Sequence, residues 1–243
     1  MTTPPRSSED DAVKGTLLSA YTNPLIKEAR DRQDEILIER FAGRPWAIAD
    51  LGCGNGYHGS IFAPAGGTYH GYEVAPQIAE LAKARWQEAG LTNARLILGD
   101  LAVAEPQENS YDLVWCLYFT PGNLRDRSED LTVYSDAYLD RNPYFIGVIS
   151  RFFKALKPGG RMFLTVYKDV PDAEAAQVDF YLNTGQHPVT PPGSRFVATA
   201  EQFWSVRWTE ASMLSNLGAC GAADGQVIFH DLNRIAWLVE IEK

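Results

Sequence analysis

Closely spaced glycines follow a short apolar run in the first quarter of the chain. Residues 46–51 are mostly apolar, and the positions that follow include Gly52, Gly54 and Gly56. The length of the run and its glycine boundary indicate a buried strand. Glycines at this spacing let the backbone turn sharply and approach a ligand, because they have no Cβ atom. With a helix predicted at 57–62, the order of strand, loop and helix is typical of the nucleotide-binding corner of an open α/β sheet.

The charge beside the glycines discriminates between nucleotide ligands. Gly54, Gly56 and Gly59 match the G-x-G-x-x-G pattern of dinucleotide sites, which is a weak signal by itself. That pattern begins two residues after Gly52, where the tight turn should lie. The carboxylate of Asp50, at the end of the strand, would repel a pyrophosphate and attract a ligand with ammonium and sulfonium groups. The pattern therefore favours a cationic ligand over NAD. The alternative is a glycine turn that binds no ligand.

The motif Asp-x-Gly-x-Gly-x-Gly at residues 50–56 resembles the signature loop of class I S-adenosylmethionine (SAM)-dependent methyltransferases. The likeness extends over about residues 40–170 and again at the C-terminus, and it includes Tyr-Asp-Leu-Val at 111–114 and Lys-Pro-Gly-Gly at 157–160. It implies that the chain binds SAM and releases S-adenosylhomocysteine (SAH) after in-line displacement of the methyl group.

Two more acidic residues follow predicted strands. Glu73 closes the strand predicted at 68–74, about 20 residues after the glycines, where α/β nucleotide folds place an acid that accepts from ribose hydroxyls. The resemblance implies that the Asp100 side chain accepts a hydrogen bond from the adenine amino group. It also implies that the backbone amide of Leu101 donates to a nitrogen of the adenine ring. The alternatives are a solvated acid at Glu73 and an ordinary turn at Asp100. By resemblance, the predicted cofactor contacts are Asp50, Gly52, Cys53, Gly54, Gly56, Glu73, Val74, Gly99, Asp100, Leu101, Leu117 and Tyr21.

A catalytic base is needed only if the acceptor must lose a proton. Tyr118 ends the apolar strand predicted at 111–118, whose carboxyl end should face the cofactor. His58 lies at a predicted helix start, which disfavours a protonated imidazole, so it is either a neutral base or a hydrogen-bonding residue around the methionine part of SAM. The candidate catalytic residues are His58, Tyr118 and Tyr138, with Asp136 and His187 as further candidates for a base.

Two segments exceed a minimal α/β fold, and both are predicted to recognise the substrate. Residues 125–142 make a long connection that carries Tyr134 and Tyr138, and residues 168–203 are irregular and rich in proline and aromatic residues. The aromatic side chains indicate an acceptor with a planar or apolar part, or an amine held over ring faces. A solvated insertion and ordinary core aromatics are the alternatives.

The predicted fold is α/β: a Rossmann-like, doubly wound, mostly parallel sheet of seven strands with an antiparallel last strand. One methyltransferase domain is predicted at 12–243, after a disordered N-terminus at 1–11. Residues 12–41 are predicted to form a helical cap, in which Tyr21 either closes over the cofactor or packs beneath a helix. The predicted strands are 46–51, 68–74, 94–98, 111–118, 161–167, 226–230 and 234–241, and the helices after the cap are 57–62, 76–89, 145–156 and 207–217.

Composition limits the partners. The net charge of −9 over 243 residues disfavours a nucleic-acid or anionic-membrane surface, so a small-molecule acceptor is expected. Three widely spaced cysteines suggest neither a disulfide framework nor a zinc site, and no metal is predicted. No membrane span or signal peptide is recognisable, which predicts a cytoplasmic protein. The alternative functions are a SAM-binding protein, or an enzyme that uses SAM without methyl transfer, and, less favoured, a nicotinamide-dependent oxidoreductase.

Overall fold

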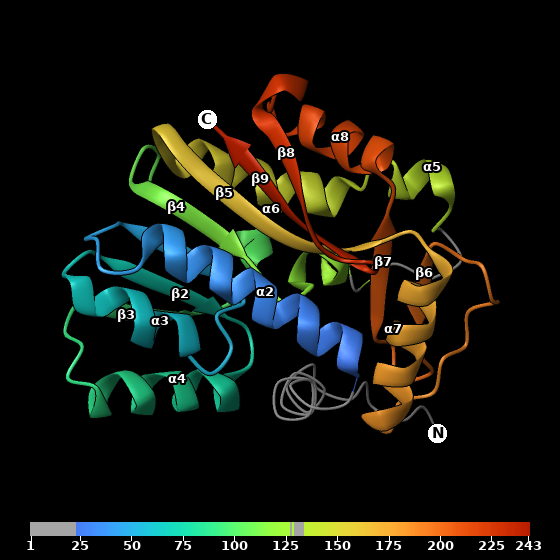
Figure 1. Ribbon diagram of the computed structural model, residues 1–243, viewed down its shortest axis with the longest axis horizontal. Coiled ribbons are helices and arrows are strands. Elements are labelled where there is room, and N and C mark those ends of the chain that lie inside the picture. The colour runs from blue at the N-terminus through green and yellow to red at the C-terminus, as the bar shows by residue number, and fades with distance from the viewer. Residues whose placement is uncertain (1–22, 127, 129–133) are drawn as a thin grey trace.

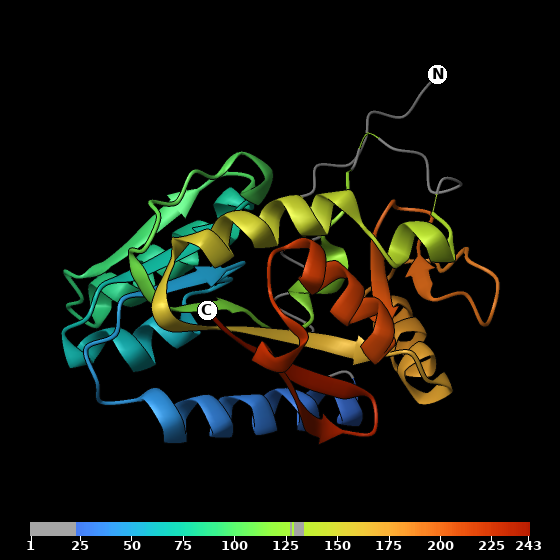
Figure 2. The same cartoon turned by 90° about the horizontal axis from the view of Figure 1, so that it is seen from above.

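A sheet runs through the molecule with helices on both of its faces (Figure 1 and Figure 2). The computed structural model describes residues 23–126, 128 and 134–243. The predicted disordered segment 1–11, the cap segment 12–22 and Tyr21 lie outside the described residues. Within the described residues the strands are β1 (Ile48–Leu51), β2 (Tyr69–Glu73), β3 (Ala94–Leu98), β4 (Tyr111–Cys116), β5 (Leu156–Lys168), β6 (Phe196–Ala198), β7 (Trp204–Trp208), β8 (Val227–Asn233) and β9 (Ala236–Glu242). The helices are α2 (Pro24–Phe41), α3 (Tyr57–Phe62), α4 (Pro76–Glu88), α5 (Asp136–Leu139), α6 (Pro143–Ala155), α7 (Pro171–Asn183) and α8 (Glu210–Ala219).

The strand order confirms the predicted mostly parallel sheet. β3, β2, β1, β4 and β5 are neighbours in this order and run parallel, so their carboxyl ends share one edge. β9 is antiparallel to β5 and is the antiparallel last strand of the prediction, and β8 pairs with β9 on its other side. The closing hairpin turns slightly later than predicted, because β8 continues to Asn233.

Two further strands extend the sheet beyond the sequence prediction. β7 continues the parallel sheet beside the carboxyl end of β5, and β6 is antiparallel to β7. Every residue of β7 is buried, so this strand lacks the alternation by which a half-buried strand is recognised. The helix predicted at 207–217 begins at Glu210, because the Thr209 side chain accepts from the Ser212 amide and caps it. Residues 207 and 208 therefore belong to β7.

The stretch at 168–203, predicted as irregular, contains helix α7. Pro171 occupies the first turn of this helix, where its missing N–H costs no intrahelical hydrogen bond. This proline therefore starts a helix rather than breaking one. Ala173, Ala176 and Tyr181 recur on the buried side of α7, and the helix packs against β6 and β7 at one end of the sheet (Figure 1).

Two strand boundaries differ from the prediction. The strand predicted at 111–118 ends at Cys116, because Tyr118 and Phe119 have φ angles of 51° and 65°, in the left-handed region that ends an extended strand. β5 begins at Leu156 rather than at the predicted residue 161, and it therefore includes the segment 157–160. Its pairing with β4 is irregular near that segment.

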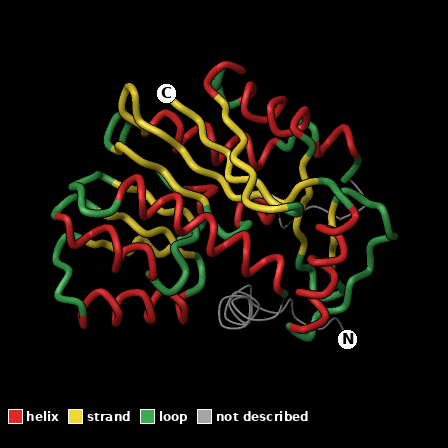
Figure 3. The backbone as a smooth tube through the Cα atoms, in the orientation of Figure 1, coloured by secondary structure: helices red, strands yellow, loops and turns green. Residues whose placement is uncertain are grey.

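Apolar clusters pack on both faces of the sheet, between the helix and strand layers that Figure 3 separates by colour. One cluster joins the sheet to α2, α3 and α4 through side chains such as Leu37, Phe62 and Trp86. The other joins it to α6 and α8 through Phe152 and Leu217. Helix α2, which the Asn23 side chain caps, is thereby fixed against one face of the sheet. In the described residues, none of the helices has the length and apolar character needed to cross a bilayer.

Candidate active site

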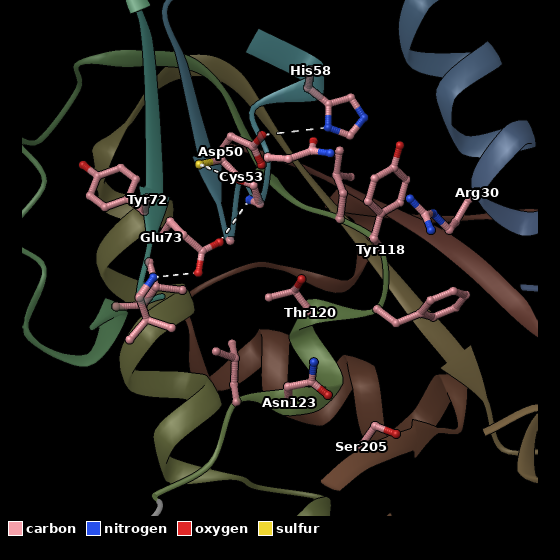
Figure 4. Close-up of a pocket in the computed structure, with 18 of the residues that line it drawn as sticks. Arg30, Asp50, Cys53, His58, Tyr72, Glu73, Tyr118, Thr120, Asn123 and Ser205 are labelled. Carbon is pink, nitrogen blue, oxygen red and sulfur yellow. Dashed lines mark hydrogen bonds and ion pairs between the residues drawn. The ribbon is translucent and has the colours of Figure 1, made fainter. Parts of the chain in front are cut away.

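The carboxyl ends of β1, β2 and β4 open into a cavity of about 620 Å³. Residues of α2 line it on one side, and residues of α7 and β7 line it elsewhere. Figure 4 shows Asp50 and Glu73 on one side of this cavity and Tyr118 across from them. Asn123 and Ser205 lie farther from the glycine loop (Figure 4). Open α/β sheets bind ligands at this edge.

The glycine loop turns tightly at the end of β1. Gly52 and Gly54 have φ angles of 77° and 55°, which suit glycine. The amides of Gly52 and Cys53 both donate to the Tyr72 carbonyl oxygen at 2.9 Å. A Cβ atom on Gly52 would lie 3.0 Å from Cγ2 of Thr120, so the loop packs closely against the turn after β4. Gly52, Cys53 and Gly54 all line the cavity.

Gly56 lies where α3 packs against α4, and it is not among the residues that line the cavity. Its φ angle is 75°, and it precedes α3. The Trp86 indole N–H donates to the Gly56 carbonyl oxygen at 2.8 Å. A Cβ atom on Gly56 would lie 2.7 Å from that indole nitrogen. The glycine that the sequence assigns to cofactor binding here is required for packing α3 on α4.

Glu73 ties the end of β2 to the glycine loop. Its carboxylate accepts from the amides of Gly54 at 3.0 Å and of Val74 and Ala75 at 2.9 Å. Burial raises the pKa of Glu73, and these backbone bonds oppose the shift by favouring the charged form. Three hydrogen bonds leave room for a further donor on its two oxygen atoms. Glu73 and Val74 line the cavity.

Asp50 lines the same cavity as Glu73 and is only 2% exposed. The Tyr69 hydroxyl donates to its carboxylate, and Nδ1 of His58 lies 3.8 Å from it. Burial raises the pKa of Asp50, while His58 and the Tyr69 bond oppose that shift. The two acidic strand ends that the sequence singles out therefore meet in one cavity.

Asp34, on α2, is a central acid of the site that sequence reasoning missed. Its carboxylate accepts from Nε2 of His58 at 3.0 Å, from the Tyr118 hydroxyl at 2.6 Å and from the Gln33 side chain at 2.8 Å. Burial acts to raise the pKa of Asp34, but the bonds from His58 and Tyr118 outweigh it and hold that pKa below its usual value. The mixed charges of α2 are typical of a surface helix and gave no signal that Asp34 faces inward.

Tyr118 has an unusual environment at the end of β4. Burial and the neighbouring Asp34 carboxylate raise the pKa of Tyr118, so its phenol stays protonated at neutral pH. The guanidinium carbon of Arg30 lies 4.0 Å from the centre of its ring, a cation–π distance. The Tyr118 amide also donates to the Gln33 side chain at 3.3 Å. Helix α2 thus contacts both the backbone and the side chain of this turn.

The other predicted site residues divide into two groups. Asp100 accepts from the Ala102 amide at 2.8 Å and from the Tyr144 hydroxyl at 2.9 Å, and it faces the cavity. Tyr138 instead packs edge-to-face on Tyr134, with ring centres 4.6 Å apart. The predicted residues that line the cavity are Asp50, Gly52, Cys53, Gly54, His58, Glu73, Val74, Gly99, Asp100, Leu101, Leu117 and Tyr118. Those the structure describes outside its wall are Gly56, Asp136, Tyr138 and His187.

The second insertion reaches the cavity, and so does the start of the first. Phe180 and Tyr181 of α7 line it, whereas Tyr134 and Tyr138 do not. The aromatic contribution expected from both insertions therefore comes from 168–203 alone. Other wall residues that sequence reasoning did not single out include Asp34, Asn123, Arg125, Tyr167, Gln177 and Ser205.

A sequence profile described as a methyltransferase domain matches residues 48–160, which run from β1 into β5 and contain the glycine loop and Glu73. Residues 48–160 of this chain are therefore a methyltransferase domain, which supports the predicted class I SAM-dependent family. SAM is accordingly the cofactor of this methyltransferase, and the predicted enzyme class is confirmed. No curated protein sequence matches the chain.

Solved structures resemble the methyltransferase over nearly its full length. The PH0226 protein of Pyrococcus horikoshii OT3 is 13% identical with a TM-score of 0.61, over 94% of this chain and 97% of that chain. Magnesium protoporphyrin IX methyltransferase of Synechocystis PCC 6803, solved with SAH, is 16% identical with a TM-score of 0.59, over 98% and 95%. The 1,6-didemethyltoxoflavin-N1-methyltransferase of Burkholderia thailandensis, solved with its acceptor and SAH, is 15% identical with a TM-score of 0.54, over 100% and 92%. This likeness confirms the predicted Rossmann-like fold.

Proposed function

We propose that this methyltransferase moves the methyl group of SAM to an N, O or C atom of a small-molecule acceptor by in-line displacement. The observation that carries the proposal is the continuity of the cavity. It runs from the acidic ends of β1 and β2 to the aromatic and polar side chains of α7 and β7. One cavity therefore offers room for a cationic donor and for an acceptor beside it.

The donor end fits SAM in charge and hydrogen bonding. Asp50 and Glu73 lie at the ends of β1 and β2, and Asp100 follows the neighbouring β3. Three carboxylates in this place would repel a pyrophosphate. We assign Glu73 to the ribose hydroxyls, Asp100 to the adenine amino group and Asp50 to the cationic methionine end. The glycine loop lets the backbone approach the ligand. When bound, SAM supplies an activated methyl group on its sulfonium.

The protein's part in the reaction is alignment and exclusion of water, because the leaving group is already activated. Tyr118 keeps its proton, which it donates in a hydrogen bond to Asp34, so we assign Tyr118 to positioning rather than to proton removal. His58 is bonded to Asp34 through Nε2 and is the better candidate for a base if the acceptor needs one. Tyr138 lies away from the cavity wall and has no assigned role in the reaction.

The acceptor end favours a compound with a planar part. Phe180 and Phe203 line the cavity there, beside Phe119, which stacks on Tyr167 at 3.8 Å between ring centres. Two of the similar structures are methyltransferases named for ring compounds, 1,6-didemethyltoxoflavin and magnesium protoporphyrin IX. Both names agree with a planar acceptor, and neither identifies the acceptor of this chain.

Ligand-induced thermal stabilisation tests the proposal. A ligand that binds only the folded state raises the melting temperature. We expect SAM and SAH to raise it and NAD and NADP to leave it unchanged. Transfer is then measured with trideuteromethyl-SAM and a pool of small metabolites, where an acceptor gains the mass of one labelled methyl group as SAH forms. Stabilisation by NAD without stabilisation by SAH would overturn the proposal, and SAH binding with no labelled product from any acceptor would favour a non-methylating SAM protein.

A further inference from the structure

Arg125 brings a buried positive charge to the wall of the cavity. It follows the short 3₁₀ turn Thr120–Asn123 after β4 and is only 5% exposed. Its Nη2 donates to the Gln202 carbonyl oxygen at 2.7 Å. Its Nη1 has no hydrogen-bond partner among the described residues. Buried charged donors are normally satisfied, because an unsatisfied one is costly.

Other arginines of this protein meet that requirement with carboxylates. Arg207, which is 1% exposed, lies 3.3 Å from Asp169 and 3.5 Å from Glu174. Arg195 lies 2.7 Å from Asp140. Over the described part of the chain Arg125 forms no such ion pair; its guanidinium carbon lies 5.8 Å from the Trp204 ring, and the exposed carboxylate of Asp126 acts on it only through a coulombic interaction. Among the described residues, Arg125 therefore has no carboxylate within ion-pair distance at the cavity wall.

A second donor lines the cavity at the same end. The Ser205 hydroxyl oxygen accepts from the Gln177 amide group at 2.7 Å and from the Tyr181 hydroxyl at 2.9 Å. Both acceptor positions are thus used, and within the described residues the Ser205 O–H itself donates to no other group. This wall presents hydrogen-bond donors and a positive charge, whereas the ends of β1 and β2 present carboxylates.

We infer that the methyl acceptor carries a carboxylate that pairs with Arg125, with Ser205 as a second donor. A single guanidinium balances one negative charge, and its planar edge matches a carboxylate in two parallel hydrogen bonds. The pairing would hold the acceptor by an end remote from the acidic strand ends, so that its ring lies beside Phe180 and Phe203. This inference rests on the proposed function, since it names the class of acceptor for that same cavity.

The test uses the full chain saturated with SAH and then adds small probes. The probes are benzoate and indole-3-carboxylate, each with its neutral amide, and phenyl phosphate. We expect the carboxylates to raise the melting temperature beyond the SAH value and the amides to raise it less. Arg125→Gln should weaken carboxylate binding at least about tenfold, as expected for loss of a charged hydrogen bond, while SAH binding is retained.

Arg195→Gln is the matched control, because Arg195 also has buried nitrogens without partners but lies outside the cavity wall. It should leave the carboxylate shift unchanged. Should Arg125→Gln fail to fold, Arg125→Lys keeps the charge and should retain part of the shift. Equal shifts from amides and carboxylates, or a larger shift from phenyl phosphate, would overturn the inference. Loss of SAH binding in Arg125→Gln would also overturn the inference, because Arg125 would then belong to the SAM site rather than to the acceptor site. Failure of SAH to stabilise the wild type would instead sink the proposed function.

Discussion

The Tyr118 hydroxyl donates to the Asp34 carboxylate at 2.6 Å, and this bond joins helix α2 to the turn after β4. Tyr118 occupies the left-handed region at φ 51°, where a side chain with a Cβ atom is strained. The bond therefore holds a strained residue in place beside the cavity. His58 shares the same carboxylate, so α2, α3 and the turn after β4 are coupled through one partly buried acid.

Neutralising that acid should destabilise the protein. We expect Asp34→Asn to lower the free energy of unfolding at pH 7 by about 1–3 kcal/mol, because a charged acceptor of buried hydrogen bonds is lost. The pKa of Asp34 is lowered on folding, so its contribution is present above its unfolded-state pKa and is lost as the pH falls through the folded value. Urea unfolding followed by tryptophan fluorescence measures the change.

The control for this change is Asp31→Asn on the same helix. Asp31 is more than half exposed and pairs with Lys27 at the surface, so its loss should cost less than about 0.5 kcal/mol. Equal losses in the two variants would show that Asp34 is not the link between α2 and β4.

Replacing the acid at the end of β2 should weaken cofactor binding. Glu73→Gln removes the charge and one acceptor from a carboxylate that holds the Gly54 amide and faces the cavity. We expect the SAH dissociation constant, measured by isothermal titration calorimetry, to rise at least about tenfold. Glu80→Gln, at an exposed acid on α4 that pairs with Lys83, is the control and should leave that constant unchanged. An unaltered constant in Glu73→Gln would remove Glu73 from the proposed ribose site.

The sequence predicted the parts of the site that local patterns encode. Gly52 and Glu73 stand at fixed positions relative to strands that short apolar runs reveal, so the topology of an α/β sheet brings them to one edge. The start of α2 is equally local, because the Asn23 side chain caps the helix and Pro24 occupies its first turn. Local chemistry of this kind can be read without knowing distant contacts.

The missed parts depend on contacts between distant segments. Asp34 and Tyr118 are 84 positions apart, and no spacing rule connects them. Arg125 lies beside β7, which is buried throughout and carries no alternation. The motif gave no sign that Trp86 of α4 fills the space next to Gly56, whose cofactor contact stays a prediction. Such roles are set by tertiary packing, which a single sequence does not display.

Stability should fall in acid as Glu240 takes up a proton. This buried carboxylate binds Arg40 through two bonds of 2.7 Å, Arg161 at 2.9 Å and His230 at 2.7 Å. Burial acts to raise the pKa of Glu240, but Arg40 and His230 lower it to about 2. At about 1.4 kcal/mol per pKa unit, this shift from 4.5 contributes about 3 kcal/mol at neutral pH.

Because the folded pKa is lowered, that contribution is present above pH 4.5 and disappears as the pH falls toward 2. Glu240→Gln should therefore lose stability at pH 7 and show a flatter decline between these values in urea unfolding at a series of pH values. Glu242→Gln, at the exposed neighbour that meets Arg161 at 3.2 Å, should retain the wild-type profile. A wild-type slope in Glu240→Gln would contradict the assignment.

Two glycines with the same backbone angle separate strain from packing. Gly43 and Gly56 have φ angles of 76° and 75°, but a Cβ atom would meet nothing within 4 Å at Gly43 and would collide with Trp86 at Gly56. Gly43→Ala should therefore cost about 1 kcal/mol for the left-handed backbone alone. Gly56→Ala should cost about 1–3 kcal/mol more, because α3 must move away from α4.

Thermal and urea unfolding of both variants measure this difference, and SAH titration of the folded protein adds a functional readout. Since Gly56 does not line the cavity, Gly56→Ala should bind SAH with nearly the wild-type constant once the fraction unfolded is taken into account. If the two variants are equally stable, the packing role is wrong. If Gly56→Ala is stable yet loses SAH binding, the glycine contacts the cofactor as its motif suggests, and the α3–α4 contact is secondary.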